Sequence, residues 1–593
     1  MNELNQTWSL KDLYKSFDDT KFVEDFEGAE KRAEAFQKKY KGRIKDIAQD
    51  TSKMAKCLRE YEELERSLNR LSSFPMLCFW ANSRDKDAQM WQNRTMERVS
   101  MANNYLIFLP LDIQKLPEEK IESLINSAEL KPYVHYFQRL LDFKPHTLNE
   151  EVEKVLNETS VTGIRAFIKL RELHIGAQEF EPVTPPDGEP VDSEAELSAL
   201  LYHPDADTRL KAYRSVREVY KEHNLLYGYI LQKIAQDHKM NTARRHYNST
   251  LEKQLLGDEV TASVYRTVIE VTRDGFDLFQ DYYRYKAKAM GIDKVRICDM
   301  YAPYESTEIK RSYEDGVETI YDAMARVDGE YASIVKGFIE GEYVDAAIRK
   351  GKRGGAFCMN IWDYHPYILL SYTGDLRAIF TFAHELGHGI HGVLANRSQR
   401  LLGAWPPMVL AEVASTFNEL LLLDHFLEVE SDVKLKKALL IKQIEDAFNL
   451  LFRQTTISRL EEDIHNKIAE TGFDHEWLNE RWTHWYNTLG GDAVEILPEH
   501  QYDWARIGHI FFKPFYCYNY CLSFMVSLAC YMKYLEEGKS FVPKFKELLS
   551  LGGSKSPEDA LVVVGIDPSD PKVMKSAIDY HREKFKQLKE IED

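Results

Sequence analysis

The sequence lacks the features that mark membrane, secreted and nucleic-acid-binding proteins. No apolar run approaches the roughly 18 residues of a transmembrane helix, and residues 1–8 lack the basic region and apolar core of a signal peptide. Asp and Glu (95) outnumber Lys and Arg (77), and the resulting net charge of −18 argues against a nucleic-acid partner. We therefore expect a cytoplasmic protein that binds neither a membrane nor a nucleic acid.

Cysteine is scarce, and no phosphate-binding loop is present. The seven cysteines are odd in number and scattered, so we expect no disulfide framework. Cys517 and Cys521 have the spacing of a metal-binding pair on a helix, but in a cytoplasmic chain we interpret them as reduced core thiols. The basic, glycine-rich segment 349–355 lacks the G-x-x-x-x-G-K-[ST] order, and we interpret it as a mobile loop.

Helical patterns dominate the rest of the chain, which is 44% hydrophobic and 29% charged. Residues 20–75 carry Glu, Lys, Ala and Leu at helical spacing, and we expect Ser73–Pro75 to interrupt the helix. Prolines and a glycine cluster in 181–190, and the surrounding segment 166–192 is a candidate hairpin at a lobe boundary. A chain of 593 residues can bury a large core. We predict a mainly α fold.

The most informative segment is His384-Glu-Leu-Gly-His388. On a helix the two histidines lie one turn apart, so both imidazoles leave the same face. Two convergent imidazoles suit Zn²⁺, which accepts nitrogen ligands in a tetrahedral site. Glu385 is rotated off that face, toward a water molecule rather than the metal. This is the H-E-x-x-H arrangement of two ligands and one general base.

The residues before the motif predict that it lies on a helix. Residues 365–372 form an apolar, aromatic run of strand length. Asp375 is a suitable N-cap, and the helix is predicted from about Leu376 to Ala395. Three glycines inside this helix weaken it, so we expect another backbone or a substrate to approach it closely (Gly387, Gly389 and Gly392).

A catalytic zinc usually has three protein ligands and one open position. The candidates for the third ligand are His391 and a downstream carboxylate. A second helix, predicted over 408–426, is apolar except for a stripe formed by Glu412, Ser415 and Glu419. Burying carboxylates on such a helix is costly unless they are paired or bound to metal. We assign Glu412 as the third ligand and Glu419 as an acceptor for a ligand imidazole.

With these motifs the chain resembles the thimet-oligopeptidase-like zinc metallopeptidases. Further segments narrow the resemblance to the oligoendopeptidase F branch: Trp8–Tyr14, Asp299–Pro303, Lys352–Phe357, His365–Gly374 and Phe511–Tyr520. The resemblance spans nearly the whole chain. It implies an ellipsoidal, two-lobed, zincin-type helical fold with a deep substrate channel and a small β-sheet near the active-site helix. It also implies cleavage within short, unfolded peptides.

The resemblance extends to a histidine and tyrosines near the C-terminus. In the family such residues lie across the cleft from the zinc and bind the substrate and the oxyanion. The matching positions are His509, Tyr516, Tyr518 and Tyr520. The alternation of the three tyrosines is not helical, so they cannot all face the zinc if the segment is a helix. The alternative is a packed aromatic cluster whose hydroxyls are satisfied locally.

We therefore expect a metalloendopeptidase with one Zn²⁺ per chain. His384, His388 and Glu412 would bind the metal, and Glu385 would act as general base. The strand at 366–372 would pair with extended substrate by β-addition. We divide the chain into an N-terminal helical lobe, residues 1–192, and a catalytic domain, residues 193–593.

Two other classes of protein stay open. A helical di-iron carboxylate protein would use two Glu-x-x-His pairs, Glu385–His388 and Glu462–His465. That site would leave His384 without a role. A catalytically silent peptide-binding protein on the same scaffold is the second alternative, although Glu385 and all the ligands are intact. The sequence leaves open the oligomeric state, the side-chain preference and loading with Co²⁺ or Mn²⁺.

Overall fold

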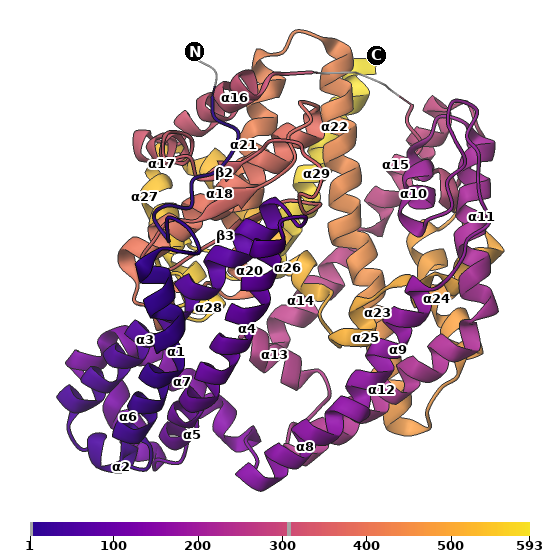
Figure 1. Cartoon of the computed structure of the whole chain (residues 1–593). Coiled ribbons are helices and arrows are strands. Elements are labelled where there is room, and N and C mark those ends of the chain that lie inside the picture. The colour runs from indigo at the N-terminus through magenta and orange to yellow at the C-terminus, as the bar shows by residue number, and fades with distance from the viewer. Residues whose placement is uncertain (1–3, 305–309, 593) are drawn as a thin grey trace. The chain divides into compact units, whose positions relative to one another are not determined.

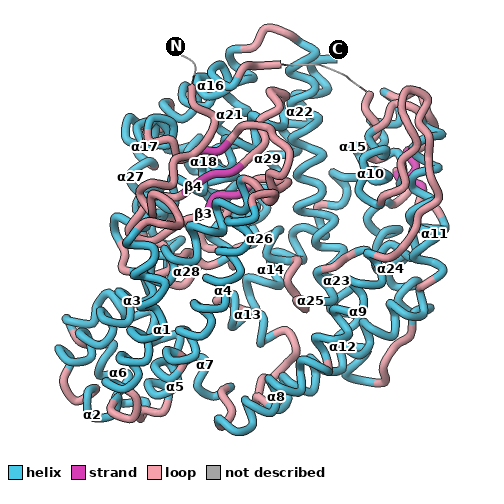
Figure 2. Tube along the Cα trace, in the orientation of Figure 1, coloured by secondary structure: helices cyan, strands magenta, loops and turns pink. Residues whose placement is uncertain are grey.

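The computed structural model describes residues 4–304 and 310–592 as a predominantly helical protein with two small sheets (Figures 1 and 2). This confirms the predicted mainly α fold class. The chain divides into two compact units that interleave along the sequence. Unit 1 comprises Met1–Lys144, Glu308–Val429 and Val526–Asp567, and unit 2 comprises Pro145–Thr307, Glu430–Met525 and Pro568–Asp593. These spatial units cut across the predicted sequence boundary at residue 192.

Unit 1 contains two helical segments around a three-stranded sheet. Its N-terminal segment has α1 (Thr20–Tyr40), α2 (Ile44–Ile47), α3 (Thr51–Ala81), α4 (Lys86–Leu106), α5 (Phe108–Gln114), α6 (Glu118–Ile125), η1 (Ala128–Tyr133), α7 (Val134–Phe143) and the start of η2 (Lys144–His146). Its remaining elements are α16 (Tyr313–Ala325), α17 (Gly329–Glu340), β2 (Val344–Asp345), β3 (Phe357–Met359), β4 (Tyr367–Leu369), α18 (Leu376–Ser398), α19 (Leu401–Ala404), α20 (Met408–Ala411), α21 (Val413–Val429), the later part of α26 (Tyr518–Glu537), η7 (Gly538–Ser540), α27 (Val542–Ser550), α28 (Pro557–Leu561) and η8 (Val562–Val564).

Unit 2 is almost entirely helical. Its elements are α8 (Glu150–Thr162), α9 (Ile164–Gly176), α10 (Glu194–Ala199), η3 (Leu200–Tyr202), α11 (Ala206–Glu222), α12 (Asn224–Arg244), α13 (Glu252–Asp258), α14 (Ala262–Asp274), α15 (Phe276–Ala289), β1 (Val295–Arg296), η4 (Ile297–Asp299), α22 (Val433–Phe448), the π-helical turn η5 (Asn449–Arg453), α23 (Gln454–Glu470), α24 (His475–Gly490), β5 (Val494–Glu495), η6 (Pro498–Arg506), α25 (His509–Phe512) and α29 (Pro571–Glu592). The predicted hairpin at 166–192 is wrong in its first half, which is helix α9. A single antiparallel bridge joins Val183 to Val191 across the proline-rich turn.

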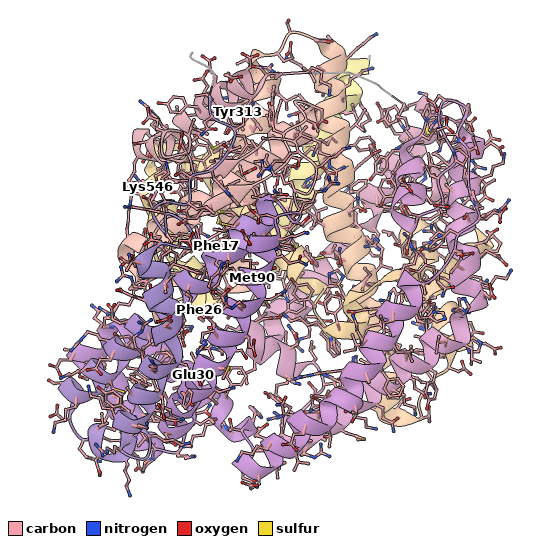
Figure 3. All side chains as sticks on the ribbon, viewed as in Figure 1. Phe17, Phe26, Glu30, Met90, Tyr313 and Lys546 are labelled. Atoms are coloured by element: carbon pink, nitrogen blue, oxygen red, sulfur yellow. The ribbon has the colours of Figure 1, made fainter. Side chains whose placement is uncertain are left out.

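An aromatic core joins the first helices of unit 1. Phe17 packs on Phe74 with ring centroids 5.3 Å apart, and Phe26 meets Trp91 at 5.4 Å (Figure 3). The predicted interruption at Ser73–Pro75 is wrong, because α3 continues through Pro75 to Ala81. Phe74 and Pro75 are both buried in this core, and tertiary packing outweighs the loss of one helical N–H.

The three-stranded sheet of unit 1 has the order β2-β4-β3, and β3 and β4 lie beside α18 (Figure 2). β4 pairs in parallel with β2 and antiparallel with β3. The expected pairing of substrate with the 366–372 strand is therefore wrong, because β4 has neighbours on both edges. In this sheet β2 and β3 are the edge strands, and the chain just after β2 already donates from the Ala346 and Ala347 N–H groups to the carbonyl oxygen of Gln6.

Candidate active site

Helix α18 carries the H-E-x-x-H motif and begins where the sequence predicts. The Asp375 side chain accepts a hydrogen bond from the Ala378 N–H at 2.9 Å, which caps the helix. A Cβ atom on Gly387 would lie only 2.5 Å from the carbonyl oxygen of Ala414. This glycine therefore lets α18 cross α21 in close backbone contact, which brings the motif up to the residues that follow Glu412.

Three possible metal ligands converge at this crossing. Nε2 of His384 and Nε2 of His388 are 3.1 Å apart, and they lie 3.3 Å and 3.4 Å from Oε2 of Glu412. Two ligands about 2.0–2.1 Å from a tetrahedral ion are themselves about 3.3–3.4 Å apart. The donor set of two imidazoles and one carboxylate, and its spacing, therefore fit a zinc ion without rearrangement. In the described part of the chain this is the one such group of three, and it does not include His391.

Other polar groups orient each of these side chains. His384 Nδ1 donates to Oε1 of Glu419 at 2.6 Å, and His388 Nδ1 donates to the carbonyl oxygen of Ala411 at 3.1 Å. The Ser415 hydroxyl donates to Oε2 of Glu412 at 2.8 Å. Because both Nδ1 atoms are occupied as donors, both Nε2 atoms are left for a metal. The contact between His384 and Glu419 is the one expected from the sequence.

Charge is unevenly distributed over this cluster. Burial opposes ionisation of Glu412, but a hydrogen bond from His384 and the charges of both histidines lower its pKa to about 2. Burial also disfavours charge on His384, yet its hydrogen bonds to Glu412 and Glu419 hold its pKa well above the usual value. A metal ion takes the place of the imidazolium proton in such a group. His391 is 4% exposed, and burial lowers its pKa to about 3, so it stays neutral.

Glu385 is buried beside the ligands. Its side chain is 6% exposed, and its Oε2 has no hydrogen-bond partner among the described residues. Burial is the main cause that raises its pKa to about 7, and Glu412 and Glu419 add to the increase while His384 opposes it. A carboxyl group with a pKa near neutrality is suited to accept and return a proton.

A cavity of about 510 Å³ opens over this group. His384, Glu385 and His388 line one part of it. Cys358 on β3 and Trp405 line other parts, and sequence reasoning assigned a site role to neither. In the sequence, only their positions could have indicated that these two residues line the site. Cys358 follows the glycine-rich segment 349–355, and Trp405 precedes two prolines between the two motif-bearing helices.

The glycine-rich segment is tied down by its own basic residues, in contrast to the mobile loop expected from the sequence. The Lys352 side chain is 1% exposed and lies 2.6 Å from Asp345. Arg349 makes a second ion pair with the same carboxylate at 2.6 Å and donates to the carbonyl oxygen of Ala81 at 3.0 Å. These contacts hold the approach to β3 in one position.

In unit 2, His509 forms a cluster with two of the three expected tyrosines. The Tyr520 hydroxyl is 3.2 Å from Nε2 of His509, and the Tyr516 ring stacks on the imidazole with centroids 5.5 Å apart. Burial lowers the pKa of His509, and the charge of Arg453 lowers it further. The imidazole is therefore neutral near pH 7 and exchanges a hydrogen bond with Tyr520.

Tyr518 does not belong to this cluster. It is fully buried, and its hydroxyl donates to Oδ2 of Asp258 at 2.9 Å. Its ring meets Tyr265 edge-on at 5.0 Å. Tyr518 begins α26, so its side chain leaves a different face from that of Tyr520 two residues later. The sequence expectation that grouped Tyr518 with His509 is corrected by this packing.

The chain shares its sequence with a known group of peptidases. A family model described as peptidase family M3 matches residues 199–580, and one described as oligopeptidase F matches residues 112–180. The chain belongs to peptidase family M3. It is therefore a peptidase, and the two matched segments lie on either side of the predicted boundary at residue 192.

Relatives and solved structures extend the match over the full chain. An oligoendopeptidase F homolog of Borreliella burgdorferi is 27% identical and covers 100% of this chain and 99% of its own. The oligopeptidase PepF of Bacillus subtilis is 26% identical over 99% of this chain and 87% of its own. A crystal structure of oligoendopeptidase F from Enterococcus faecium superposes with a TM-score of 0.70 at 20% identity, covering 96% of this chain and 97% of its own. A protein from Chlamydophila abortus reaches a TM-score of 0.90 at 23% identity, covering 99% and 98%. These likenesses show the fold of the peptidase.

Two further expectations concern membranes and disulfides. None of the helices in the described residues has the length and apolarity needed to cross a bilayer. All seven cysteines are free, and Cys517 and Cys521 are buried. Burial raises the pKa of the Cys521 thiol to about 12, so this thiol stays protonated.

Proposed function

We propose that this peptidase is a zinc-dependent endopeptidase that cleaves internal bonds of short, unfolded peptides. The observation that supports the proposal best is the spacing of the nitrogen and oxygen atoms of His384, His388 and Glu412 beside the buried Glu385. A zinc ion held by these ligands would lower the pKa of a bound water toward 7 and polarise the scissile carbonyl. The same donor set can also bind Co²⁺ or Mn²⁺. Elemental analysis of the purified protein would identify the bound metal.

Glu385 is the proposed general base. It would take the proton of the attacking water and return it to the leaving amine. Its pKa of about 7 and its unpartnered Oε2 support both steps, because the carboxyl group can exist in either protonation state near neutral pH. The second hydrogen bonds of His384 and His388 keep the imidazoles oriented while the proton moves.

We propose that the substrate backbone pairs with β3 rather than with the strand at 366–372. β3 has β4 on one edge, and its Phe357 and Cys358 line the cavity over Glu385. An extended peptide added to the open edge would gain main-chain hydrogen bonds whatever its side chains. The ion pairs of Arg349 and Lys352 in the glycine-rich segment 349–355 would keep the open edge of β3 in place before substrate binds.

His509 and Tyr520 are the proposed donors to the oxyanion, with Tyr516 supporting the imidazole. This proposal rests on the family resemblance and on the hydrogen bond between His509 and Tyr520. Preorganised donors of this kind typically contribute about 10²–10³-fold to turnover. Tyr518 is left out of the proposal because its hydroxyl is committed to Asp258.

The names of the relatives support short peptides as the substrate class, and the structure offers little support for the di-iron alternative. Oligopeptidases are named among them, so short peptides are the proposed substrates. A cytoplasmic location is part of the proposal and agrees with seven free thiols. The di-iron alternative would need Glu462 and His465 in a metal group, and neither belongs to the one group found in the described residues.

The test is mass spectrometry of a mixed peptide library after incubation with the purified protein. We expect internal cleavage that stops when a chelator removes the metal and returns when zinc is restored. Glu385→Gln should keep its metal and cleave far more slowly. Cleavage that persists without metal would overturn the proposal. Binding of peptides without cleavage would favour the silent peptide-binding protein.

A further inference from the structure

Besides the cavity over Glu385 in unit 1, the protein has a polar cavity in unit 2. None of the residues that line it has a proposed catalytic role. Its volume is about 340 Å³, and residues of α11, α22, η5, α24 and η6 line it. Helix α11 packs on α10, beside which it lies in Figure 1, and η6 contacts both α11 and α24. A single water needs only about 10–15 Å³ of such space. The cavity therefore has room for a ligand larger than water.

Arginines dominate the charge of this cavity, and the carboxylates near it already have partners. Asp503 lies 2.6 Å from Arg217 and 3.1 Å from Arg506. Arg506 also meets Glu194 at 2.8 Å. The ion pairs of these carboxylates are thus with arginines other than Arg453, and the charge of Asp503 acts on Arg453 only from beyond ion-pair distance.

The remaining carboxylate of the cavity is occupied as well. Glu445 lies 2.6 Å from Lys286, which is fully buried, and it accepts a hydrogen bond from the Tyr282 hydroxyl at 2.6 Å. In the parts of the chain that the structure describes, no carboxylate oxygen comes within ion-pair distance of Arg453. One guanidinium charge of the cavity wall is left without an anionic partner.

Arg453 lies in a π-helical turn that borders the cavity. It is the last residue of the π-helical turn η5, which joins α22 to α23. Single π-helical turns are rare and occur frequently at functional sites. Asn449, the first residue of the same turn, also lines the cavity and accepts a hydrogen bond from the Tyr301 hydroxyl at 2.8 Å.

Two further groups in the cavity wall have a donor to spare. Nε of Arg217 and Nε2 of His500 are buried and have no hydrogen-bond partner among the described residues. Nδ1 of His500 lies 2.9 Å from the Tyr213 hydroxyl, and with the tyrosine as donor the imidazole proton sits on Nε2. The unsatisfied groups of this wall are therefore donors and a cation, which is the complement of an anion.

We propose that this cavity is a binding site for a small monoanion, such as a halide or a small carboxylate, held by Arg453. One unpaired guanidinium matches a single negative charge. A dianion such as phosphate would leave a charge uncompensated in a buried site. The site does not overlap the proposed peptidase site, because the cavity is lined by neither His384, Glu385 nor His509.

Occupation of the site would have a consequence for the His509 cluster. After burial, the charge of Arg453 is the second cause of the low pKa of His509, and Tyr516 and Tyr520 are the titratable groups that contact the imidazole. An anion beside Arg453 would offset that charge. The pKa of His509 would then rise toward its ordinary value.

The direct test is crystallography of the full chain grown in bromide, with anomalous scattering to locate the ion. We expect a bromide peak within hydrogen-bond distance of the Arg453 guanidinium. In solution, chloride or acetate should raise the melting temperature in a saturable way, compared with gluconate at equal ionic strength. A response to acetate alone would assign the site to carboxylates, and a response to chloride alone would assign it to halides.

Variants separate the site from general salt effects. Arg453→Gln should abolish the anion-dependent shift in melting temperature, and Arg453→Lys should keep part of it because the charge remains. The matched control is Arg459→Gln on the following helix, since Arg459 is already paired with Glu462 at 2.6 Å. That control should keep the full shift. A wild-type protein with no bromide in the cavity and the same melting temperature in all three anions would overturn the proposal.

Discussion

The three candidate metal ligands of unit 1 and two buried side chains of unit 2 differ in how completely their polar atoms are hydrogen-bonded. In unit 1 His384, His388 and Glu412 each have a second hydrogen bond that fixes the side chain. In unit 2 buried atoms of Glu461 and His500 have no partner among the described residues. The first pattern is that of ligands oriented before a metal arrives. The second leaves room for a proton or a small ion.

This difference predicts what each unit is sensitive to. Removing a group from the metal cluster of unit 1 leaves its partners misoriented, so changes there should have large effects on metal content and turnover. Glu461 and His500 of unit 2 are already incompletely paired, so changes to these two groups should act through protonation and stability. The following predictions sharpen or break this comparison.

The largest effect is expected from the third ligand. Glu412→Ala removes the carboxylate of the cluster, so zinc content and peptide cleavage should both fall sharply. Metal analysis after dialysis against dilute chelator measures the first, and a peptide assay measures the second. Glu428→Ala is the matched control, because Glu428 lies on α21, the helix that begins directly after Glu412, is 62% exposed and, among the described residues, forms its ion pair with Arg326. If Glu412→Ala kept its full zinc content, His391 would become the candidate ligand.

The next effect separates the base from the ligands. Glu385→Gln keeps the shape of the side chain but cannot take a proton. Turnover should fall about 10²–10⁴-fold, the usual contribution of a general base, while zinc content and folding stay unchanged. A variant that cleaves peptides near the wild-type rate would rule out Glu385 as the base.

A smaller effect is expected from Glu419, which contacts the proposed ligand His384 rather than the metal. Glu419→Ala leaves all three ligands in place but removes the acceptor that orients His384 at 2.6 Å. Metal affinity should fall about 10–100-fold. Competition with a chelator of known affinity measures it. Glu419→Gln should recover part of the loss because the amide oxygen can still accept the hydrogen bond, and an Ala variant with wild-type affinity would contradict the orienting role.

Features of unit 1 that depend on local spacing could be predicted from the sequence. Helix α18 starts after Asp375 as predicted and extends three residues beyond the predicted end at Ala395. The helical spacing of Glu412 and Glu419 predicted that both carboxylates lie on one polar face of the second helix. Helix α21 nevertheless begins only at Val413, after a break at Glu412.

Features that depend on distant segments could not be predicted. β4 is central because β2 and β3, from separate segments, pair on its two edges. Nothing in the apolar run itself reveals how many neighbours it will have. The Arg453 cavity likewise combines segments hundreds of residues apart, and its π-helical turn has no recognisable sequence signal. Tyr518 could not be separated from Tyr520 until the start of α26 was known.

The tyrosines of unit 2 offer a matched pair of substitutions. Tyr520→Phe removes the hydroxyl next to His509, so turnover should fall by up to about 10²–10³-fold with stability nearly unchanged. Tyr518→Phe removes one donor to Oδ2 of Asp258 and leaves the donors from Asn519 and Gln254 in place. It should cost about 0.5–1.5 kcal/mol of stability, the usual net contribution of one hydrogen bond, with turnover nearly unchanged. Kinetics and thermal unfolding of both variants measure the contrast, and unchanged turnover in Tyr520→Phe would reduce the cluster to packing.

The smallest effect concerns a single buried proton. Glu461 is 2% exposed, its Oε1 accepts a hydrogen bond from the Phe515 N–H at 2.6 Å, and burial raises its pKa to about 8. The same carboxyl has a pKa near 4.3 in an unfolded chain. Between these values the folded state holds a proton that the unfolded state has released. Stability therefore falls as pH rises through this window, and the loss is complete above pH 8.

Glu461→Gln should remove this dependence, because the amide stays neutral at every pH. The variant should gain on the wild type by about 1.4 kcal/mol for each pH unit between the two pKa values, as an upper bound. Thermal unfolding at pH 5, 7 and 9 measures the gain. The control is Glu470→Gln, an exposed residue on the same helix, which should leave the pH dependence unchanged. Parallel pH profiles for the wild type and Glu461→Gln would mean that the carboxyl is ionised in the folded protein, so that unit 2 supplies it with a partner as unit 1 does for its ligands.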